Sequence, residues 1–490
     1  MRRPTLIPLL LLVPVLALSL PGCTANPATG GQTFTGTMST AEEIRIGRQE
    51  HPKIIKTFGG TYGGPKLADY VAGIGQRLAR NAERRDITYK FTVLNSDIVN
   101  AFAMPGGYIY ISRGLLALAS DEAELAAVLA HEIGHLTALH HGERQGQDLL
   151  AQLLVAGLGI AAGRQAADVG GMVAGGVLRG FSREQELQSD DLGIRYMARA
   201  GFDPGAMAAF LRKLRAEGRL QAKRRRESPD SVDAFNYLAT HPAPQARVSR
   251  AAARAKGVHV ANPRRGEDTY LGQIDGMLYG DDPAQGFIRG RVFAHPSLRF
   301  RFEVPPGFRL FNSEQTVVAL GPKGATIQFD MAAKPADGPM PYYLSHVWGR
   351  KLGVRLNGVE GIAVNGLQAA TGRARIQTRD GAQDVRLVAI RFDLQRIFRF
   401  LFLTPVGETA RHEVGLRRTT YSFRLLDEPE AAQLRPLRIR IRKTAAGDTL
   451  KRLADKMAFE EFRTEWFQVL NGLTDVQKLA AGSKVKIVTE

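Results

Sequence analysis

Four of the ten histidines of the chain lie in one short stretch, residues 128–144, which reads VLAHEIGHLTALHHGER. Its segment HEIGH fits the pattern HExxH. Residues four apart share a face of a helix, so His131 and His135 can bind one tetrahedral Zn²⁺ together. Glu132 lies one step further round, where its carboxylate reaches a metal-bound water rather than the metal. The pattern therefore predicts one zinc ion per chain, with Glu132 as the general base that takes a proton from that water.

Two imidazoles and a water leave one ligand to find, and His141 is the first candidate. It follows His131 by ten residues, the spacing of the pattern HExxHxxGxxH. That pattern needs a glycine at position 138 to turn the chain out of the helix, and this chain has Ala138. We therefore expect the helix to continue through residues 136–139. It would rotate His140 and His141 away from the metal, toward solvent or contacts around the site.

A downstream carboxylate is the second candidate. The segment GFSREQELQSDDLG carries Glu186 and Asp190 four residues apart, on one face of a predicted helix. Glu186 would complete a His₂Glu ligand set. Asp190 would accept a hydrogen bond from the outer N–H of a ligating histidine and so hold its tautomer. An ordinary charged helix face is the alternative, and it is our interpretation for Glu184 and Asp191.

The elements around the HExxH segment follow from periodicity and turn residues. Residues 89–114 alternate like two strands around a Pro-Gly-Gly turn. The next helix opens at Asp121, with Glu124 three residues later in the pattern of a capping box. One of these strands is expected to lie beside the metal, where an extended substrate can pair with it by β-augmentation. The alternative is an ordinary hairpin with no role in binding.

Four segments together resemble the HtpX/BepA-type zinc metallopeptidases, which are the gluzincins of metallopeptidase family 48. They are HEIGH, the earlier NAFAMPGGYIYISRGLL, and the later SREQELQSD and THPAPQAR, in this order and spacing. The resemblance covers residues 41–256. It implies that His131, His135 and Glu186 bind zinc, that Glu132 is the base and that Asp190 supports a ligand. The family often has Glu-x-Glu-Ala-Asp where this chain has ELQSD, so only the intervening pair departs.

The segment THPAPQAR adds His241 and Arg247. In the family this His-Pro segment lies at the active-site cleft. Arg247 is then expected to stabilise the oxyanion of the tetrahedral intermediate. His241 would do the same, or would occupy the fourth zinc position and hold the enzyme idle. A plain helix start is the alternative.

The N-terminus predicts export. Two arginines precede an apolar run at residues 6–20, and the run leads to Cys23, the single cysteine of the chain. This arrangement resembles a bacterial lipobox and predicts a signal peptide over residues 1–22 with lipid on Cys23. Plain secretion is the alternative. We expect a lipid-anchored protein of the cell envelope that faces the periplasm, on the outer rather than the inner membrane.

The remaining chain is long enough for several domains. It has 490 residues and a formal net charge of +18, with Lys and Arg spread along its length. Because no dense basic block with interleaved aromatics occurs, we expect no nucleic-acid partner. The predicted fold class is multidomain α+β, arranged as a tether at residues 23–40, a mainly helical metallopeptidase domain at 41–257, a linker at 258–290, an α+β sandwich at 291–428 and a small βααβ unit at 437–490.

The two C-terminal units carry resemblances of their own. The sandwich is similar to the Mog/PsbP type and is interpreted as a domain that docks substrates or partners. The last unit resembles a LysM module, with Asp448 as a helix cap, which implies peptidoglycan as a partner. A βααβ unit that only packs on its neighbour is the alternative.

These features together predict a zinc metalloendopeptidase that acts in quality control on misfolded or unassembled envelope proteins. Two other functions stay open. One is a peptidoglycan-binding chaperone or scaffold whose protease site is blocked. The other is a hydrolase of peptidoglycan cross-links.

Overall fold

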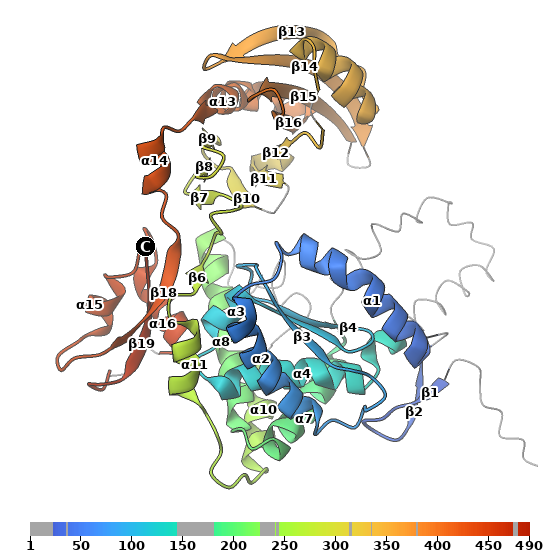
Figure 1. Cartoon of the computed structure of the whole chain (residues 1–490), viewed down its shortest axis with the longest axis vertical. Helices are drawn as coiled ribbons and strands as arrows, with labels where there is room; N and C mark the ends of the chain where they lie inside the picture. The colour runs from blue at the N-terminus through green and yellow to red at the C-terminus, as the bar shows by residue number, and fades with distance from the viewer. Residues whose placement is uncertain are drawn as a thin grey trace, which may run out of the picture.

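Figure 1 shows a mainly helical part, a sheet-rich part above it and a small unit formed by the end of the chain at one side. The predicted signal peptide lies outside the described residues, and Cys23 lies in the first strand. The computed structural model describes residues 23–35, 38–144, 181–225, 241, 245–312, 316–334, 336–378, 381–473 and 479–490.

The helical part contains a small mixed sheet flanked by helices. Its three strands are ordered β3-β5-β4, with β3 parallel and β4 antiparallel to β5. A short hairpin of two strands precedes it. The elements are β1 (Cys23–Ala25), β2 (Gln32–Phe34), α1 (Thr40–Thr57), α2 (Gly64–Ala79), β3 (Lys90–Leu94), β4 (Ala101–Met104), β5 (Tyr108–Ser112), α3 (Arg113–Leu118), α4 (Glu122–Thr137), α7 (Arg183–Arg199), α8 (Gly205–Arg225) and α10 (Gln245–Lys256).

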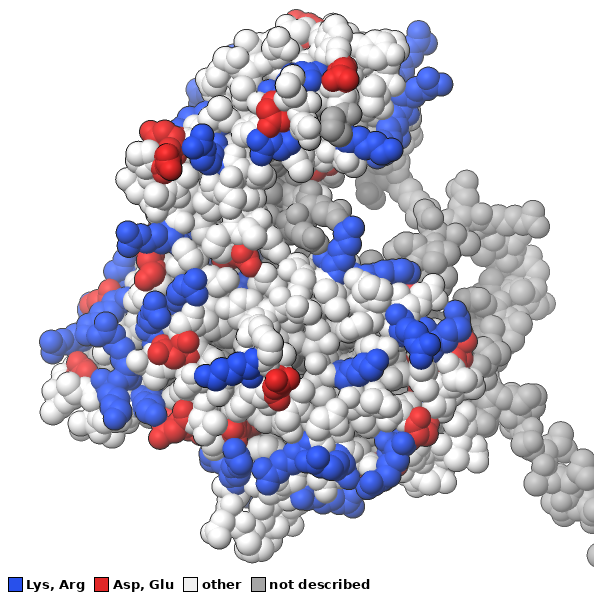
Figure 2. Space-filling model, in the orientation of Figure 1, with Lys and Arg blue, Asp and Glu red and all other residues white. Residues whose placement is uncertain are grey.

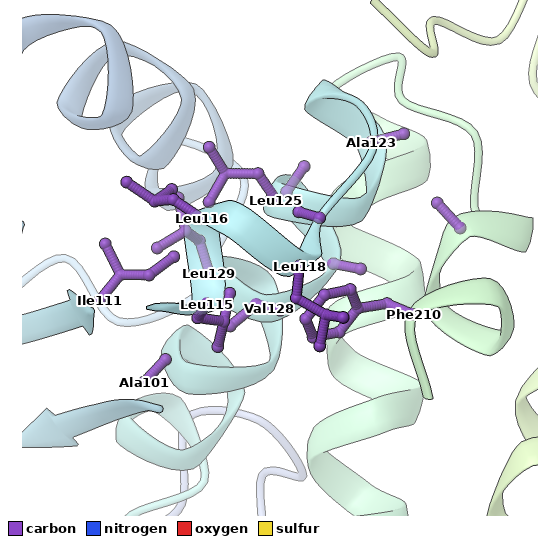
Figure 3. Packing of buried hydrophobic residues seen from close by; sticks show 14 of the residues in the cluster. Ala101, Ile111, Leu115, Leu116, Leu118, Ala123, Leu125, Val128, Leu129 and Phe210 are labelled. Carbon is purple, nitrogen blue, oxygen red and sulfur yellow. The ribbon is translucent and has the colours of Figure 1, made fainter. Parts of the chain in front are cut away.

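Helix α4 is the centre of this part, and every one of its residues is buried. Asp121 caps it by accepting a hydrogen bond from the backbone N–H of Glu124, as the sequence predicts. The Glu124 carboxylate, however, accepts from the backbone N–H of Ser120 rather than from Asp121. Figure 3 shows the apolar side chains of α4 packed against those of α3 and α8. This burial holds in place the helix that carries HExxH.

The sheet-rich part is built from two antiparallel sheets. The strand order is β10-β11-β12-β16-β15-β14-β13 in the larger sheet and β17-β9-β8-β7 in the smaller. A cluster of buried phenylalanines forms the core around which both are built. The elements are β7 (Phe287–Arg289), β8 (Val292–His295), β9 (Phe300–Glu303), β10 (Arg309–Asn312), β11 (Thr316–Leu320), η1 (Pro322–Gly324), β12 (Thr326–Met331), α12 (Met340–Tyr342), η2 (Tyr343–Gly349), β13 (Asn357–Val364), β14 (Leu367–Thr378), β15 (Gly381–Arg391), β16 (Ile397–Pro405), η3 (Val406–Glu408), α13 (Thr409–Ser422) and β17 (Arg424–Leu425).

The end of the chain forms a strand-helix-helix-strand unit whose two strands pair antiparallel. Its first strand also pairs with β6, so the stretch predicted as a linker contains a helix and strands of its own. Thr449, rather than the predicted Asp448, caps the first helix, and Asp448 accepts from the backbone N–H of Ala445. The elements are α11 (Glu267–Ile274), β6 (Leu278–Tyr279), α14 (Glu428–Gln433), β18 (Leu437–Lys443), α15 (Leu450–Ala454), α16 (Arg463–Asn471) and β19 (Lys484–Thr489).

This C-terminal unit shares one hydrophobic core with the helical part. Lys486 on β19 is fully buried, and its ammonium group donates to the carbonyls of Ala117, Leu118 and Ala119 at 2.9, 3.0 and 2.7 Å. Carbonyls at the end of a helix have no partner within the helix. A lysine from the far end of the chain therefore satisfies the end of α3, directly before α4 begins.

The surface carries both signs of charge. Figure 2 shows Lys and Arg distributed over every part of this face, with Asp and Glu among them. No helix among the described residues combines the length and the apolar character that a membrane crossing requires.

Candidate metal centre

Four potential metal ligands converge at the junction of α4 and α7. His131 and His135 lie on α4, Glu186 lies on α7, and His241 lies just before α10. One ligand atom from each lies within 4.8 Å of the others. All four residues are at most 2 % exposed. The structure thus brings together the three predicted ligands and adds His241, the residue whose place in the site the sequence left open.

The contacts within this cluster are short. The Nε2 atoms of His131 and His135 lie 3.0 Å apart, and Glu186 Oε1 lies 3.3 Å from His135 Nε2. Nδ1 of His241 lies 2.8 Å from Glu186 Oε1 and 3.2 Å from His131 Nε2. Three imidazoles and one carboxylate are a donor set that suits Zn²⁺ in tetrahedral geometry.

Two glycines let α4 and α7 approach closely enough to form the cluster. A Cβ atom on Gly134 would lie 3.0 Å from the Ser189 carbonyl oxygen of α7. A Cβ atom on Gly193 would lie 3.2 Å from the backbone nitrogen of His131. Both distances are tighter than ordinary packing allows, so a larger residue at either position would push the two helices apart. Sequence reasoning gave neither glycine this role.

Helix α7 begins so that its carboxylates reach the centre. Ser182 and Gln185 form a reciprocal capping box at its N-terminus. Glu186 follows in the first turn, and Asp190 lies one turn further on the same face. Oδ1 of Asp190 accepts a hydrogen bond from Nδ1 of His131 at 3.0 Å. That bond leaves Nε2 of His131 free of a proton and directed at the cluster, as the sequence predicts for a residue that supports a ligand.

Arg247 on α10 neutralises both carboxylates. Its guanidinium contacts Asp190 at 2.6 and 2.9 Å and forms an ion pair with Glu186. Burial alone would raise the pKa of both acids, but Arg247 and the neighbouring histidines hold the pKa of Glu186 well below its usual range and lower that of Asp190. Both groups are therefore ionised. The guanidinium pairs with both carboxylates in this structure, and its role toward the oxyanion stays a prediction.

Glu132 lies next to His241 and is fully buried. Nε2 of His241 lies 3.7 Å from Glu132 Oε1, so the His241 ring lies between the general-base candidate and Glu186. Burial by itself lowers the pKa of His241, but the carboxylates of Glu186 and Glu132 raise it above its usual value. Burial holds the pKa of His135 well below the usual value, which suits a neutral ligand.

His140 contacts His135, which is one of the two places expected for it, but the expected continuation of the helix through residues 136–139 is wrong. Helix α4 ends at Thr137, and Leu139 adopts a left-handed conformation with φ of 60°. The chain therefore turns without a glycine, although such a conformation costs about 1 kcal/mol in a residue with a side chain. The turn brings His140 Nδ1 to 2.9 Å from His135 Nδ1, while His140 Nε2 lies 2.7 Å from Gln188 Oε1.

The tautomers of this relay follow from its last member. The amide oxygen of Gln188 only accepts, so His140 donates from Nε2 and accepts on Nδ1 from the Nδ1–H of His135. Nε2 of His135 is then free for a metal. Gln188 lies at one of the two positions where ELQSD departs from the family pattern. His141, the competing third ligand, is not part of the metal cluster.

An aromatic ring covers one side of the cluster. Phe181 stacks on His135 with ring centroids 3.8 Å apart, and it contacts His241 at 5.3 Å. The guanidinium of Arg144 also contacts Phe181, 4.0 Å from the centre of the ring, in a cation–π interaction. His141 meets the same ring edge-on at 5.3 Å. Nothing in the local sequence around Phe181 indicated this position.

The arrangement defines a class of protein. Two histidines from an HExxH helix, a glutamate from a second helix and a buried acid beside the metal position form the site of a zinc metallopeptidase. Residues 65–255 match the model of Peptidase family M48. This part of the chain is therefore similar to the M48 family of zinc metallopeptidases.

Several curated relatives share this part of the chain. Beta-barrel assembly-enhancing protease of Escherichia coli (strain K12) is 31% identical over 251 residues, which is 49% of each chain. Its namesake in Yersinia pestis is 35% identical over 217 residues, 42% of each chain. Mitochondrial metalloendopeptidase OMA1 of Schizosaccharomyces pombe is 28% identical over 191 residues, 37% of this chain and 51% of that one. The chain spans about half the length of these relatives.

Solved structures match the sheet-rich part weakly. Cyanobacterial PsbP (CyanoP) from Synechocystis sp. PCC 6803 has a TM-score of 0.23 at 13% identity and covers 31% of this chain and 98% of that one. The Saccharomyces cerevisiae Ran-binding protein Mog1p has a TM-score of 0.21 at 12% identity, over 29% and 98%. TM-scores of this size do not establish a common fold.

Proposed function

We propose that this protein is a zinc-dependent endopeptidase whose metal is held by His131, His135 and Glu186. The observation that carries the proposal is the convergence of these three side chains from two helices, with Glu132 beside them. A bound Zn²⁺ would polarise the scissile carbonyl and activate a water. Glu132 takes a proton from that water and passes it to the leaving amine.

Other buried side chains prepare the ligands for this task. Asp190 and His140 accept from the outer N–H groups of the two ligand histidines, which keeps Nε2 of each directed at the metal position. Arg247 stabilises the charge of Glu186 and Asp190 in a buried environment. These contacts place the ligand atoms before a metal binds, which lowers the cost of ordering them.

His241 occupies the fourth ligand position in the resting protein. Its Nδ1 lies among the ligand atoms and its Nε2 faces Glu132, so the ring fills the space that a catalytic water needs. A substrate must displace His241 before cleavage starts. The centre would then be closed at rest, which protects folded neighbours in the envelope.

The substrates proposed here are misfolded or unassembled envelope proteins. Strand β4 lies at an edge of its sheet and packs against α4, the helix that carries Glu132. We propose this strand as the one with which an extended chain pairs. Such pairing recognises the backbone of the substrate more than its side chains, so it favours unfolded segments of varied sequence. Several relatives are named beta-barrel assembly-enhancing protease, which supports a role in assembly quality control.

The cellular setting stays part of the proposal. It comprises a signal peptide over residues 1–22, lipid on Cys23, a tether to residue 40 and an envelope location that faces the periplasm. The proposed domains are the metallopeptidase domain at 41–257, the Mog/PsbP-like sandwich at 291–428 and the LysM-like unit at 437–490. The sandwich would dock substrates, and the last unit would bind peptidoglycan.

Two observations bear on the last unit. Its strand-helix-helix-strand order supports the LysM-like interpretation. Its shared core with the helical part and the buried Lys486 contacts support the alternative, a unit that only packs on its neighbour. A peptidoglycan-binding scaffold and a cross-link hydrolase therefore stay as rival functions.

The decisive test compares casein cleavage by the wild type and Glu132→Gln, with bound zinc measured in both. We expect both proteins to hold zinc and the variant to lose at least about 100-fold in cleavage rate, because only the proton carrier has changed. Zinc-loaded wild type that cleaves no faster than Glu132→Gln would reject the peptidase. Release of muropeptides from purified sacculi by the wild type alone would favour the cross-link hydrolase.

A further inference from the structure

A second cavity lies in the sheet-rich part, away from the metal centre. It has a volume of about 270 Å³, and its lining residues come from α13 and the strands β14, β15 and β16. Figure 1 shows where these elements lie in the sheet-rich part. Its charged lining consists of three arginines and two acids, and its remaining lining is largely apolar. The charged residues are Arg373, Arg375, Asp384, Arg386 and Glu413.

Two rungs of the β14–β15 ladder, separated by the Ala374–Val385 pair, differ in how their charges are matched. Arg375 lies directly opposite Asp384, and the two form an ion pair at 2.8 Å. Arg373 lies directly opposite Arg386, so two positive charges face each other across the strands. Like charges in this position destabilise a sheet. The second rung therefore carries a repulsion that Glu413, which pairs with Arg373, offsets in part.

The partners of these two arginines differ. Arg373 reaches outward to Glu413 on α13 at 3.0 Å. Arg386 donates from Nε to Thr371 Oγ1 at 3.1 Å. Among the described residues, no acid lies within ion-pair distance of Arg386, and its two terminal nitrogens have no hydrogen-bond partner there. Burial and the nearby Arg373 both lower the pKa of Arg386, which stays charged because a guanidinium begins so high.

We propose that this cavity binds the carboxylate at the end of a polypeptide chain, through the two terminal nitrogens of Arg386. Two parallel N–H groups match the two oxygens of a carboxylate. Three arginines and two acids leave one positive charge, which suits a singly charged group better than a phosphate. An anion here would also relieve the repulsion between Arg373 and Arg386.

The apolar lining favours a chain end rather than a free small acid. Phe402 and Leu416 lie beside the charged groups and can cover the side chain of a terminal residue. The volume is at the lower limit of ordinary ligand pockets, which suits one terminal residue. The inference deepens the docking role proposed for the sheet-rich part. It does not depend on peptidase activity, because it concerns binding alone.

The test uses the full chain with Glu132→Gln, so that no probe is cleaved. The probe is a peptide, Gly-Ser-Gly-Ser-Ala-Leu, dye-labelled at its N-terminus and made with a free or an amidated C-terminus. Fluorescence anisotropy measures its affinity. We expect the free acid to bind at least about tenfold more tightly than the amide. Arg386→Gln should abolish that difference, whereas Arg417→Gln, an exposed arginine on α13 outside the cavity, should preserve it.

A second variant guards against loss through misfolding. Glu413→Gln removes a negative charge from the cavity, so we expect it to bind the free-acid peptide several-fold more tightly. Equal binding of acid and amide, or unchanged binding by Arg386→Gln, would overturn the proposal. An amidated peptide that ends in Asp has a side-chain carboxylate but no terminal one. If it bound as tightly as the free-acid peptide, the cavity would recognise a side-chain carboxylate rather than the end of a chain. Displacement by inorganic phosphate at lower concentration than by acetate would reject a carboxylate in favour of phosphate.

Discussion

The guanidinium of Arg247 contacts both carboxylate oxygens of Asp190, with Nε 2.6 Å from Oδ2 and Nη2 2.9 Å from Oδ1. Asp190 in turn accepts from Nδ1 of His131 at 3.0 Å. A buried chain of three groups thus runs from α10 through α7 to His131 on α4, which we propose as a zinc ligand. The charge of Asp190 therefore depends on Arg247. The same arginine also lies close to the His131 ring, with Nη2 3.3 Å from Nδ1 and 3.4 Å from Nε2.

Arg247→Ala should weaken zinc binding by about 10- to 100-fold, because it leaves Glu186 and Asp190 as buried acids without a counter-charge and loosens His131. Competition with a chelator of known zinc affinity measures the change. Arg250→Ala is the matched control, since Arg250 lies on the same helix, is exposed and pairs with Asp191 at the surface. An equal effect of the two variants would contradict a specific role for Arg247.

His140→Ala should also weaken zinc binding, by about tenfold, because His135 loses the acceptor that holds its Nδ1 proton. The same chelator titration measures it. His141→Ala tests whether the loss of any neighbouring histidine has this effect, and we expect it to bind zinc more tightly than His140→Ala. The relay would be of no consequence if His140→Ala retained the wild-type affinity.

His241→Ala should raise the basal rate of casein cleavage several-fold, because the fraction of molecules with an open fourth position rises. His131, His135 and Glu186 remain to hold the zinc, and metal content is measured alongside the rate. An unchanged or lower rate in a zinc-loaded variant rejects the idea that His241 holds the enzyme idle.

Lys486→Met should lower the free energy of unfolding of the C-terminal unit by about 2–4 kcal/mol, because the buried carbonyls of Ala117 and Ala119 lose this donor. The Leu118 carbonyl keeps a second donor, Nζ of Lys213 at 3.2 Å. Trp466 lies in this unit and Trp348 is the other tryptophan of the chain. Urea unfolding followed by fluorescence in a Trp348→Phe background therefore reports on the unit. Lys484→Met on the same strand, where the lysine pairs with the exposed Asp268, is the control. Equal midpoints for the two variants would contradict the anchoring role.

Asp281 provides a test of pH dependence. Burial raises its pKa from 3.8 to about 6. The folded state then holds this proton more tightly than the unfolded chain, so stability is lost as pH rises through about 4 to 6. Asp281→Asn cannot ionise and keeps an acceptor for the backbone N–H of Ile288. We expect its thermal midpoint to exceed that of the wild type at pH 8 by more than at pH 4, by the equivalent of about 2 kcal/mol.

The control for that measurement is Asp268→Asn, whose side chain is 81% exposed. The difference in thermal midpoint between this variant and the wild type should change less between pH 4 and pH 8 than that of Asp281→Asn, because Asp268 is exposed. If the difference in thermal midpoint between Asp281→Asn and the wild type did not increase from pH 4 to pH 8, ionisation of the buried Asp281 would not destabilise the folded state.

The sequence by itself determined the parts of the site that lie within single helices. His131 and His135, and likewise Glu186 and Asp190, are four residues apart, and helix geometry alone places each pair on one face. The caps at Asp121 and Ser182 depend on neighbouring residues in the same way. These features are local, because a hydrogen bond or a shared face between residues three or four apart needs nothing from the rest of the chain.

Only the tertiary structure decided which remote groups meet. The turn at Leu139, which brings His140 to His135, contradicts the local preference for a continued helix. It occurs where the buried Leu139 side chain and the bond from Asn26 to the Ala138 carbonyl can stabilise it. The pairing of Arg247 with two acids and the facing of Arg373 by Arg386 depend on helix packing and strand register. Those are set by burial of the whole core, which no short stretch of sequence encodes.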